Sequence, residues 1–129
     1  MTIQPRKFIP QSVSLDLSYL QQVSEGDISF EREILLLYLR EVPLLAQKTK
    51  KTLKVGDYKT AADLIHKLKS KIRVIGLKQA WRLADFIETG LRKKTNLSEL
   101  VKKIKVFFKI ILQSVQLAKK ELLKRTCTK

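Results

Sequence analysis

Apolar side chains recur every three or four residues through most of the chain, which is the spacing of one face of an α-helix. The pattern is clearest between residues 61 and 75, where stepping the residues at about 100° each gathers the apolar positions on one stripe. No segment shows the strict alternation that is typical of a β-strand. The pattern therefore predicts an all-α protein with helices at about 15–23, 29–55, 61–75, 77–94 and 97–123.

Short links between these segments indicate how the helices are arranged. Gly26 is suited to end the first helix, with Asp27 or Ser29 as the cap of the next, and Gly56-Asp57 combines the same two roles at the following link. Gly76 ends the third segment. Links this short return the chain alongside the helix that precedes them. We therefore expect an up-down-up-down four-helix bundle preceded by a short N-terminal helix.

The length of 129 residues suits one domain. Pro5 and Pro10 interrupt any helical pattern near the N-terminus, so residues 1–14 are expected to form an extended lead-in. The helical bundle should cover residues 15–123, and residues 124–129 should be a disordered tail.

Helical spacing also predicts which side chains face the core. In the segment 61–75 the inward positions are Ala61, Leu64, Ile65, Leu68, Ile72 and Ile75. In the long segment 29–55 they are Phe30, Ile34, Leu37, Tyr38, Leu45 and Leu53. In the segment 77–94 they are Leu77, Ala80, Trp81, Ala84, Ile87 and Leu91.

The single histidine, His66, falls well away from the apolar stripe of its helix. Ser70 and Arg73 lie close to it on the polar side, and Lys69 follows one turn later, within side-chain reach. The periodicity therefore predicts an imidazole that is displayed to solvent and not packed in the core.

Charge is the unusual feature of the composition, with a formal net charge of +15. Such a surface attracts acidic partners, and nucleic acid, an anionic membrane and an acidic protein all qualify. No apolar run reaches the ~20 residues that a membrane span needs, and the N-terminus lacks an apolar targeting core, so we expect a cytoplasmic protein without a membrane partner. One histidine and one cysteine, Cys127, cannot build a metal-ligand set, and we expect no metal or cofactor.

The run His66-x-Leu68-Lys69-Ser70, with Gly76 ten residues after the histidine, resembles the phospho-accepting helix of histidine-containing phosphotransfer (HPt) domains. The order and spacing of the surrounding elements follow the same family over residues 15–123. The chain departs from the family at Ser70, where a glycine is common, and in Lys71, where small residues usually follow. Serine at this position places a side chain beneath a docking partner, or hydrogen-bonds the phosphoryl group.

The resemblance implies a phosphorelay intermediate of two-component signalling. His66 would accept a phosphoryl group from a receiver-domain aspartate and pass it to another receiver, and Lys69 would stabilise the phosphoryl group. Lys67, Ser70 and Arg73 would contact the receiver, which supplies the Mg²⁺. No glycine-rich nucleotide site is present, so we expect a monomeric phosphocarrier and not an enzyme with its own ATP site.

Two other readings of the sequence stay open. The first is a basic helical module that binds nucleic acid or another polyanion. Its lysines and arginines are spread over several helices without a recognition-helix or stacking-aromatic signature, so nucleic acid is the less favoured partner. The second is a degenerate HPt bundle that acts only as a docking protein and never carries phosphate.

Overall fold

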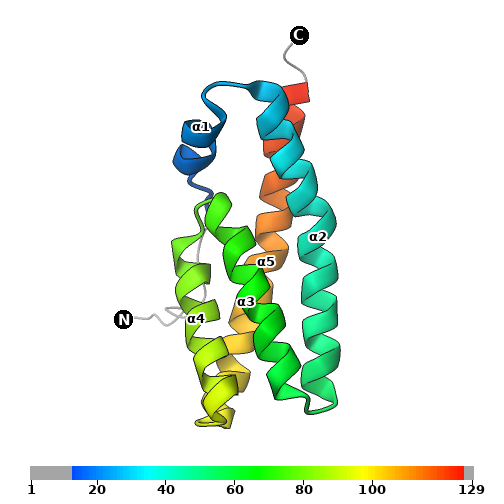
Figure 1. Cartoon of the computed structure of the whole chain (residues 1–129), viewed down its shortest axis with the longest axis vertical. Helices are drawn as coiled ribbons and strands as arrows, with labels where there is room; N and C mark the ends of the chain where they lie inside the picture. Colours follow the sequence, from blue (N-terminus) through cyan, green and yellow to red (C-terminus); the bar gives the residue numbers. More distant parts are fainter. Residues whose placement is uncertain (1–12, 127–129) are drawn as a thin grey trace, which may run out of the picture.

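The computed structural model describes residues 13–126, and the predictions made for residues 1–12 and 127–129 lie outside this part of the chain. Within it the regular structure is entirely helical, as predicted. The helices are α1 (Ser18–Ser24), α2 (Ile28–Lys54), α3 (Tyr58–Val74), α4 (Lys78–Lys93) and α5 (Leu97–Thr126). The four longer helices form a bundle, in which α2 packs against α3 and α5, and α4 packs against α3 and α5 (Figure 1). No helix in residues 13–126 is both long and apolar enough to cross a membrane.

Two aspartates set the starts of α2 and α3, and of the two caps that the sequence allows for α2 the structure uses Asp27. The Asp27 carboxylate accepts a hydrogen bond from the backbone N–H of Phe30 at 3.1 Å, and the Asp57 carboxylate accepts one from Thr60 at 3.2 Å. Each satisfies a backbone donor that has no partner within its own helix. The preceding residues Gly26 and Gly56 have φ angles of 84° and 80°, which glycine adopts without steric cost.

The core lies between the four longer helices. The stripe predicted for α3 is confirmed, because all its members are buried except Leu64, which is partly buried. Opposite it, Leu100, Phe107 and Ile110 of α5 are the largest fully buried side chains of their helix. The apolar side chains buried in α4 are Ala80, Ala84, Ile87 and Leu91, as predicted, whereas Trp81 is only half-buried.

The inward face of α2 differs from the prediction. Phe30 and Leu37 are each 38% exposed and do not face the core. Tyr38 is buried as predicted, and Ile34, Leu45 and Leu53 are partly buried against the core. The prediction missed Leu35, Val42 and Thr49, which are buried on the same face. Apolar residues occupy all six positions from 34 to 39, so they surround the helix and its sequence does not single out one side. Tertiary contacts decide the orientation, among them a hydrogen bond of 2.7 Å between the hydroxyls of Tyr38 and Ser114 on α5.

The end of α5 also differs from the prediction, because the helix continues to Thr126 and not only to Leu123. The Arg125 guanidinium donates to the carboxylates of Glu31 on α2 and Glu121 on α5, both at 2.9 Å. Ser24 of α1 donates its hydroxyl to the same Glu31 carboxylate at 2.6 Å. Residues 124–126 therefore belong to the bundle, where Arg125 joins α5 to α2, and Glu31 joins α2 to α1.

The buried Glu31 makes the stability of this end depend on pH. The Ser24 hydroxyl and the Arg125 guanidinium hydrogen-bond its carboxylate, and together they hold the pKa of Glu31 below its ordinary value despite burial. Because the pKa is lower in the folded than in the unfolded chain, this stabilisation is complete at neutral pH and is lost as the pH falls through the carboxyl range. We expect Glu31→Gln to flatten the acid side of the stability–pH curve, measured by urea unfolding. The exposed Glu33→Gln is the control, and equal flattening in both variants would contradict the assignment.

Candidate functional site: the exposed histidine of α3

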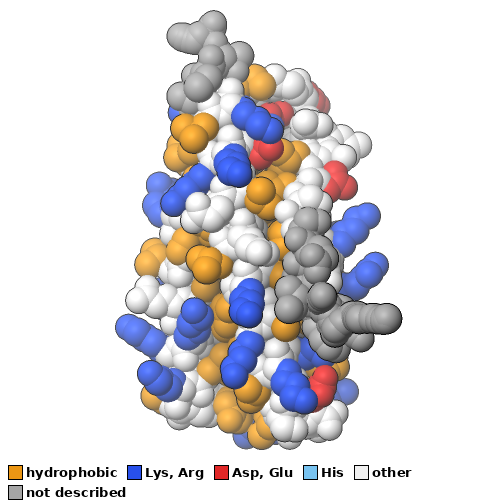
Figure 2. Space-filling view, turned by 180° about the vertical axis from the view of Figure 1, so that it is seen from behind, with side chains coloured by type: hydrophobic (Ala, Val, Ile, Leu, Met, Phe, Trp, Pro, Cys, Tyr) orange, Lys and Arg blue, Asp and Glu red, His pale blue; other side chains and the backbone are white. Residues whose placement is uncertain are grey.

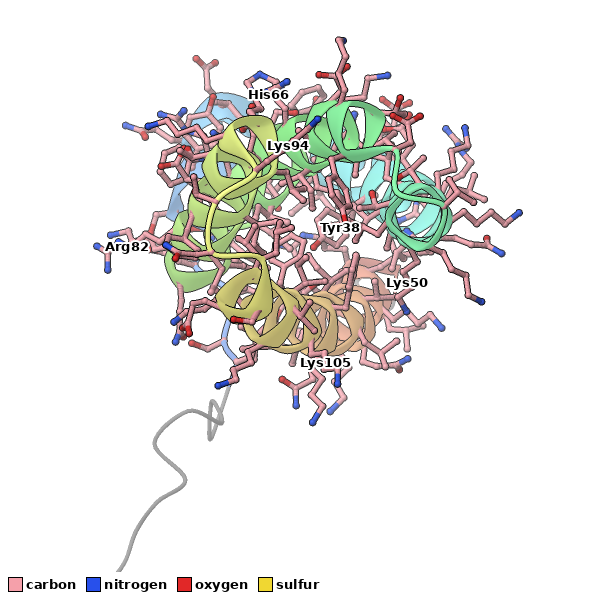
Figure 3. All side chains as sticks on the ribbon, turned by 90° about the horizontal axis from the view of Figure 1, so that it is seen from below. Tyr38, Lys50, His66, Arg82, Lys94 and Lys105 are labelled. Carbon is pink, nitrogen blue, oxygen red and sulfur yellow. The ribbon has the colours of Figure 1, made fainter. Side chains whose placement is uncertain are left out.

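His66 lies in the middle of α3, and its side chain is 65% exposed. Its neighbours Ile65 and Leu68 are fully buried, so the helix turns the imidazole away from the core. The view along the bundle in Figure 3 shows His66 on the outer side of the molecule. The position of the histidine is the one that its periodicity predicts.

A carboxylate from the next helix holds the imidazole. Nδ1 of His66 lies 3.2 Å and 3.3 Å from the two carboxylate oxygens of Glu88 on α4. Because a carboxylate only accepts hydrogen bonds, Nδ1 must be the nitrogen that carries the proton in this contact. In the neutral ring the other nitrogen, Nε2, then holds the free lone pair.

Lys69 reaches the site through the same carboxylate and not through the imidazole. Its ammonium lies 3.0 Å from Asp85 and 3.0 Å from Glu88, and 4.9 Å above the ring of Trp81. The side chain is only 13% exposed. Burial by itself lowers the pKa of Lys69, but the hydrogen bonds to the two carboxylates outweigh it and raise the pKa, so the ammonium is charged.

Arg92 completes the set of donors around Glu88. Its Nη2 lies 2.9 Å from Glu88, and its Nη1 lies 3.0 Å from Asp63 of α3. The Glu88 side chain is 11% exposed. Burial on its own raises the pKa of Glu88, but hydrogen bonds from Lys69, Arg92 and His66 outweigh it and hold the pKa below the ordinary value. Glu88 is therefore an ionised carboxylate, shared by two cations and the imidazole.

The other predicted residues take different positions along α3. Ser70 is exposed, and its hydroxyl donates to the backbone carbonyl of Lys67 at 2.8 Å. Arg73 is exposed on the same side as His66, and Lys67 is exposed as well. Lys71, in contrast, turns to α2 and pairs with Glu41 at 2.7 Å. It therefore adds no charge beside the histidine.

A hollow extends from His66 toward α1. It has a volume of about 440 Å³, and it is lined by Tyr19, His66, Lys69, Ser70, Arg73, Val74 and Trp81. A larger cleft of about 610 Å³ shares Tyr19, Arg73 and Trp81 with it and continues past the turn between α3 and α4. Two aromatic rings and the Arg73 cation thus line a surface that begins at the histidine.

Three acidic residues of this site were not predicted from the sequence. Glu88 and Asp85 belong to α4, and Asp63 lies one turn before the histidine. The i,i+4 spacing of Glu88 and Arg92 indicates an ion pair on α4, but it does not indicate the histidine. The contacts that Asp85, Glu88 and Arg92 make with α3 depend on how α3 and α4 are aligned along their axes. Only the packing of the buried faces of α3 and α4 determines that alignment.

Among residues 13–126, no group of three or more His, Cys, Asp or Glu side chains is arranged to hold a metal ion. No family model, curated protein or solved structure matches the chain.

Proposed function

We propose that the chain is a phosphorelay intermediate of the HPt type, in which His66 accepts a phosphoryl group from the aspartate of one receiver domain and passes it to another. The observation behind this proposal is the exposed imidazole whose Nδ1 is engaged by the buried Glu88 carboxylate. This arrangement leaves Nε2 as the nucleophile. We further propose that the chain does this as a monomer in the cytoplasm.

The transfer requires only one bond to form and one to break. The Nε2 lone pair attacks phosphorus in line with the receiver's acyl phosphate, the phosphorus–oxygen bond breaks, and the aspartate leaves as a carboxylate. The attack places positive charge on the imidazole ring. Glu88 accepts the Nδ1 proton in a hydrogen bond and stabilises this charge without moving. The reverse sequence of steps delivers the phosphoryl group to the second receiver.

Two cationic side chains lie close enough to His66 to interact with a phosphoryl group bound there. Lys69 and Arg92 both bond Glu88, the carboxylate that holds the imidazole. A phosphoryl dianion on Nε2 competes with Glu88 for these flexible side chains, and we propose that Lys69 turns toward it. Lys69 would thus stabilise the phosphorylated state although it contacts carboxylates in the unmodified chain.

The receiver would dock over the hollow beside His66. The aromatic rings of Tyr19 and Trp81 offer an apolar contact, and Arg73 and Ser70 offer polar contacts around it. The net charge of +15 favours an acidic partner face and speeds the encounter. We propose Lys67, Ser70 and Arg73 as residues of this contact.

The proposal includes the topology of the family, an up-down-up-down bundle of α2 to α5 with α1 as a short N-terminal helix over one end. The short links between successive helices support it. So does the packing of α2 against α5, which brings the first and last long helices together.

A matched pair of substitutions tests the role of Glu88 as a positioning residue. Glu88→Gln keeps an oxygen that accepts from Nδ1–H, whereas Glu88→Met has a similar size and no acceptor. We expect transfer to stay within about tenfold in the first variant and to fall about 100-fold in the second, because only the second releases the ring and its tautomer. Nitrogen-15 NMR of the histidine ring reads the tautomer directly. Equal rates in the two variants would contradict this role.

Phosphotransfer profiling tests the function itself. The chain is incubated with each phosphorylated receiver domain of the organism that encodes it, and the transferred label is examined for stability. We expect at least one receiver to transfer its label rapidly, in a form that is labile to acid, as a phosphohistidine is. Absence of transfer from every receiver would refute the proposal.

A further inference from the structure

The face of the bundle opposite His66 has its own chemical character. Figure 3 shows His66 and Lys105 on opposite sides of the bundle, with Lys105 on the outer surface of α5. In the view of that face in Figure 2, basic and hydrophobic side chains alternate along the molecule, and acidic side chains lie toward its ends. This surface is separate from the histidine site.

The outward residues of α5 combine lysines with large apolar side chains. Val101, Leu112 and Leu123 are 52%, 66% and 61% exposed. They are spaced eleven residues apart, which is about three helical turns, so they form one row about 33 Å long. Exposed lysines flank the row. We call the whole set the α5 stripe: Val101, Lys102, Lys105, Lys109, Leu112, Lys119, Lys120 and Leu123.

No acidic residue interrupts the α5 stripe. The two acids of α5 lie on other sides of the helix, where Glu99 is 4.0 Å from Lys103, and Glu121 bonds Arg125 at 2.9 Å. A cation from α2 extends the basic surface, because Lys50 lies 5.0 Å above the ring of Phe108 on α5. All charged side chains of the stripe are thus cationic, and its exposed apolar side chains recur every eleven residues.

Single exposed leucines are ordinary on protein surfaces. A row of exposed apolar side chains flanked by lysines, in contrast, is complementary to a surface that is both apolar and anionic. At an anionic lipid surface, leucine and valine side chains enter the boundary between headgroups and acyl chains. Lysine stems lie along the same boundary, and their ammonium groups reach the lipid phosphates. An anionic lipid surface therefore provides a favourable environment for both the apolar and the basic side chains of this helix face.

We propose that the α5 stripe binds peripherally to an anionic lipid surface and leaves His66 facing away from it. The sequence led us to expect no membrane partner because no segment spans a bilayer, but peripheral binding requires no span. Nucleic acid fits the stripe less well, because the apolar row has no counterpart on a sugar–phosphate backbone. Phe108, an aromatic ring of α5, lies under the Lys50 ammonium instead of offering a free stacking surface.

Co-sedimentation of the full chain with lipid vesicles tests the proposal. We expect binding to vesicles of phosphatidylcholine with phosphatidylglycerol, and none to vesicles of phosphatidylcholine alone. The triple variant K102Q/K105Q/K109Q should weaken binding about 100-fold, as expected for three lysines near an anionic surface. The control K59Q/K93Q/K94Q removes the same charge from α3 and from the C-terminal end of α4, and it should bind almost as the unmodified chain does.

A second variant separates the lipid from other polyanions. L112Q/L123Q keeps every charge of the stripe and alters two exposed side chains, so it should fold normally and lose most vesicle binding. Failure to bind anionic vesicles, or equal loss in the control variant, would overturn the proposal. Tight binding of a short DNA duplex that is unaffected by L112Q/L123Q would overturn it too, and would assign the stripe to nucleic acid. These outcomes are independent of phosphotransfer at His66.

Discussion

Replacing His66 with glutamine is expected to abolish phosphoryl transfer, with a loss of more than about 1,000-fold, because the substitution removes the proposed nucleophile itself. Glutamine has a similar length and still donates a hydrogen bond toward Glu88, so the site keeps its shape. The measurement is the initial rate of label transfer from the best receiver found by profiling.

The same variant should remain folded, which separates a chemical loss from a structural one. The imidazole is 65% exposed, and Glu88 keeps its bonds to Lys69 and Arg92. We therefore expect the free energy of unfolding to change by less than about 1 kcal/mol. A His66→Gln protein that still accepts an acid-labile label would contradict the assignment of the histidine.

Gly76→Ala is expected to destabilise the fold by about 4 kcal/mol, the largest effect we predict for a single methyl group. Gly76 has a φ of 72°, where an alanine is strained, and an added Cβ would lie 2.6 Å from the Cβ of Asp16 and still closer to its carbonyl oxygen. The chain before α1 crosses the turn between α3 and α4 here, and the Asp16 N–H donates to the carbonyl of Ile75 at 3.1 Å. Thermal and urea unfolding measure the loss.

Gly56→Ala is the matched control for this substitution. Its φ of 80° imposes the same backbone strain, but nothing lies within 4 Å of the added Cβ. The control should therefore cost only about 1 kcal/mol, the conformational part of the effect. Equal losses of unfolding free energy at the two glycines would show that the steric conflict between the added methyl group and Asp16 adds nothing to the effect of Gly76→Ala.

The sequence predicted the parts of the fold that depend on interactions between residues close together in the chain. The α3 stripe from Ala61 to Ile75 and the two Gly-Asp links follow from helical spacing and capping alone. The orientation of α2 does not, because apolar side chains surround the helix near Tyr38 and only contacts such as the bond to Ser114 select one face. The end of α5 likewise depends on Arg125 meeting Glu31, which is 94 residues away in the sequence.

The candidate site likewise has one part that the sequence predicts and another that depends on packing between helices. The exposure of His66 is a property of one helix and was predictable from its spacing. The partners of His66 and Lys69 belong to α4, and no pattern within either helix specifies how the two align. Lys69 was expected one turn after His66 and within its reach, and the spacing did not predict that its ammonium lies over Trp81 and shares Glu88 with the histidine. The carboxylate that accepts a hydrogen bond from Nδ1 of His66 is visible only in the packed structure.

The most direct test of the role of His66 is the site of phosphorylation on its ring. The chain, labelled with nitrogen-15 in histidine, is phosphorylated by a receiver and examined by NMR. Attachment at Nε2, with Nδ1 still protonated, is the result that the contact with Glu88 predicts. Attachment at Nδ1, or no phosphorylated histidine after exposure to every receiver of the organism, would contradict it.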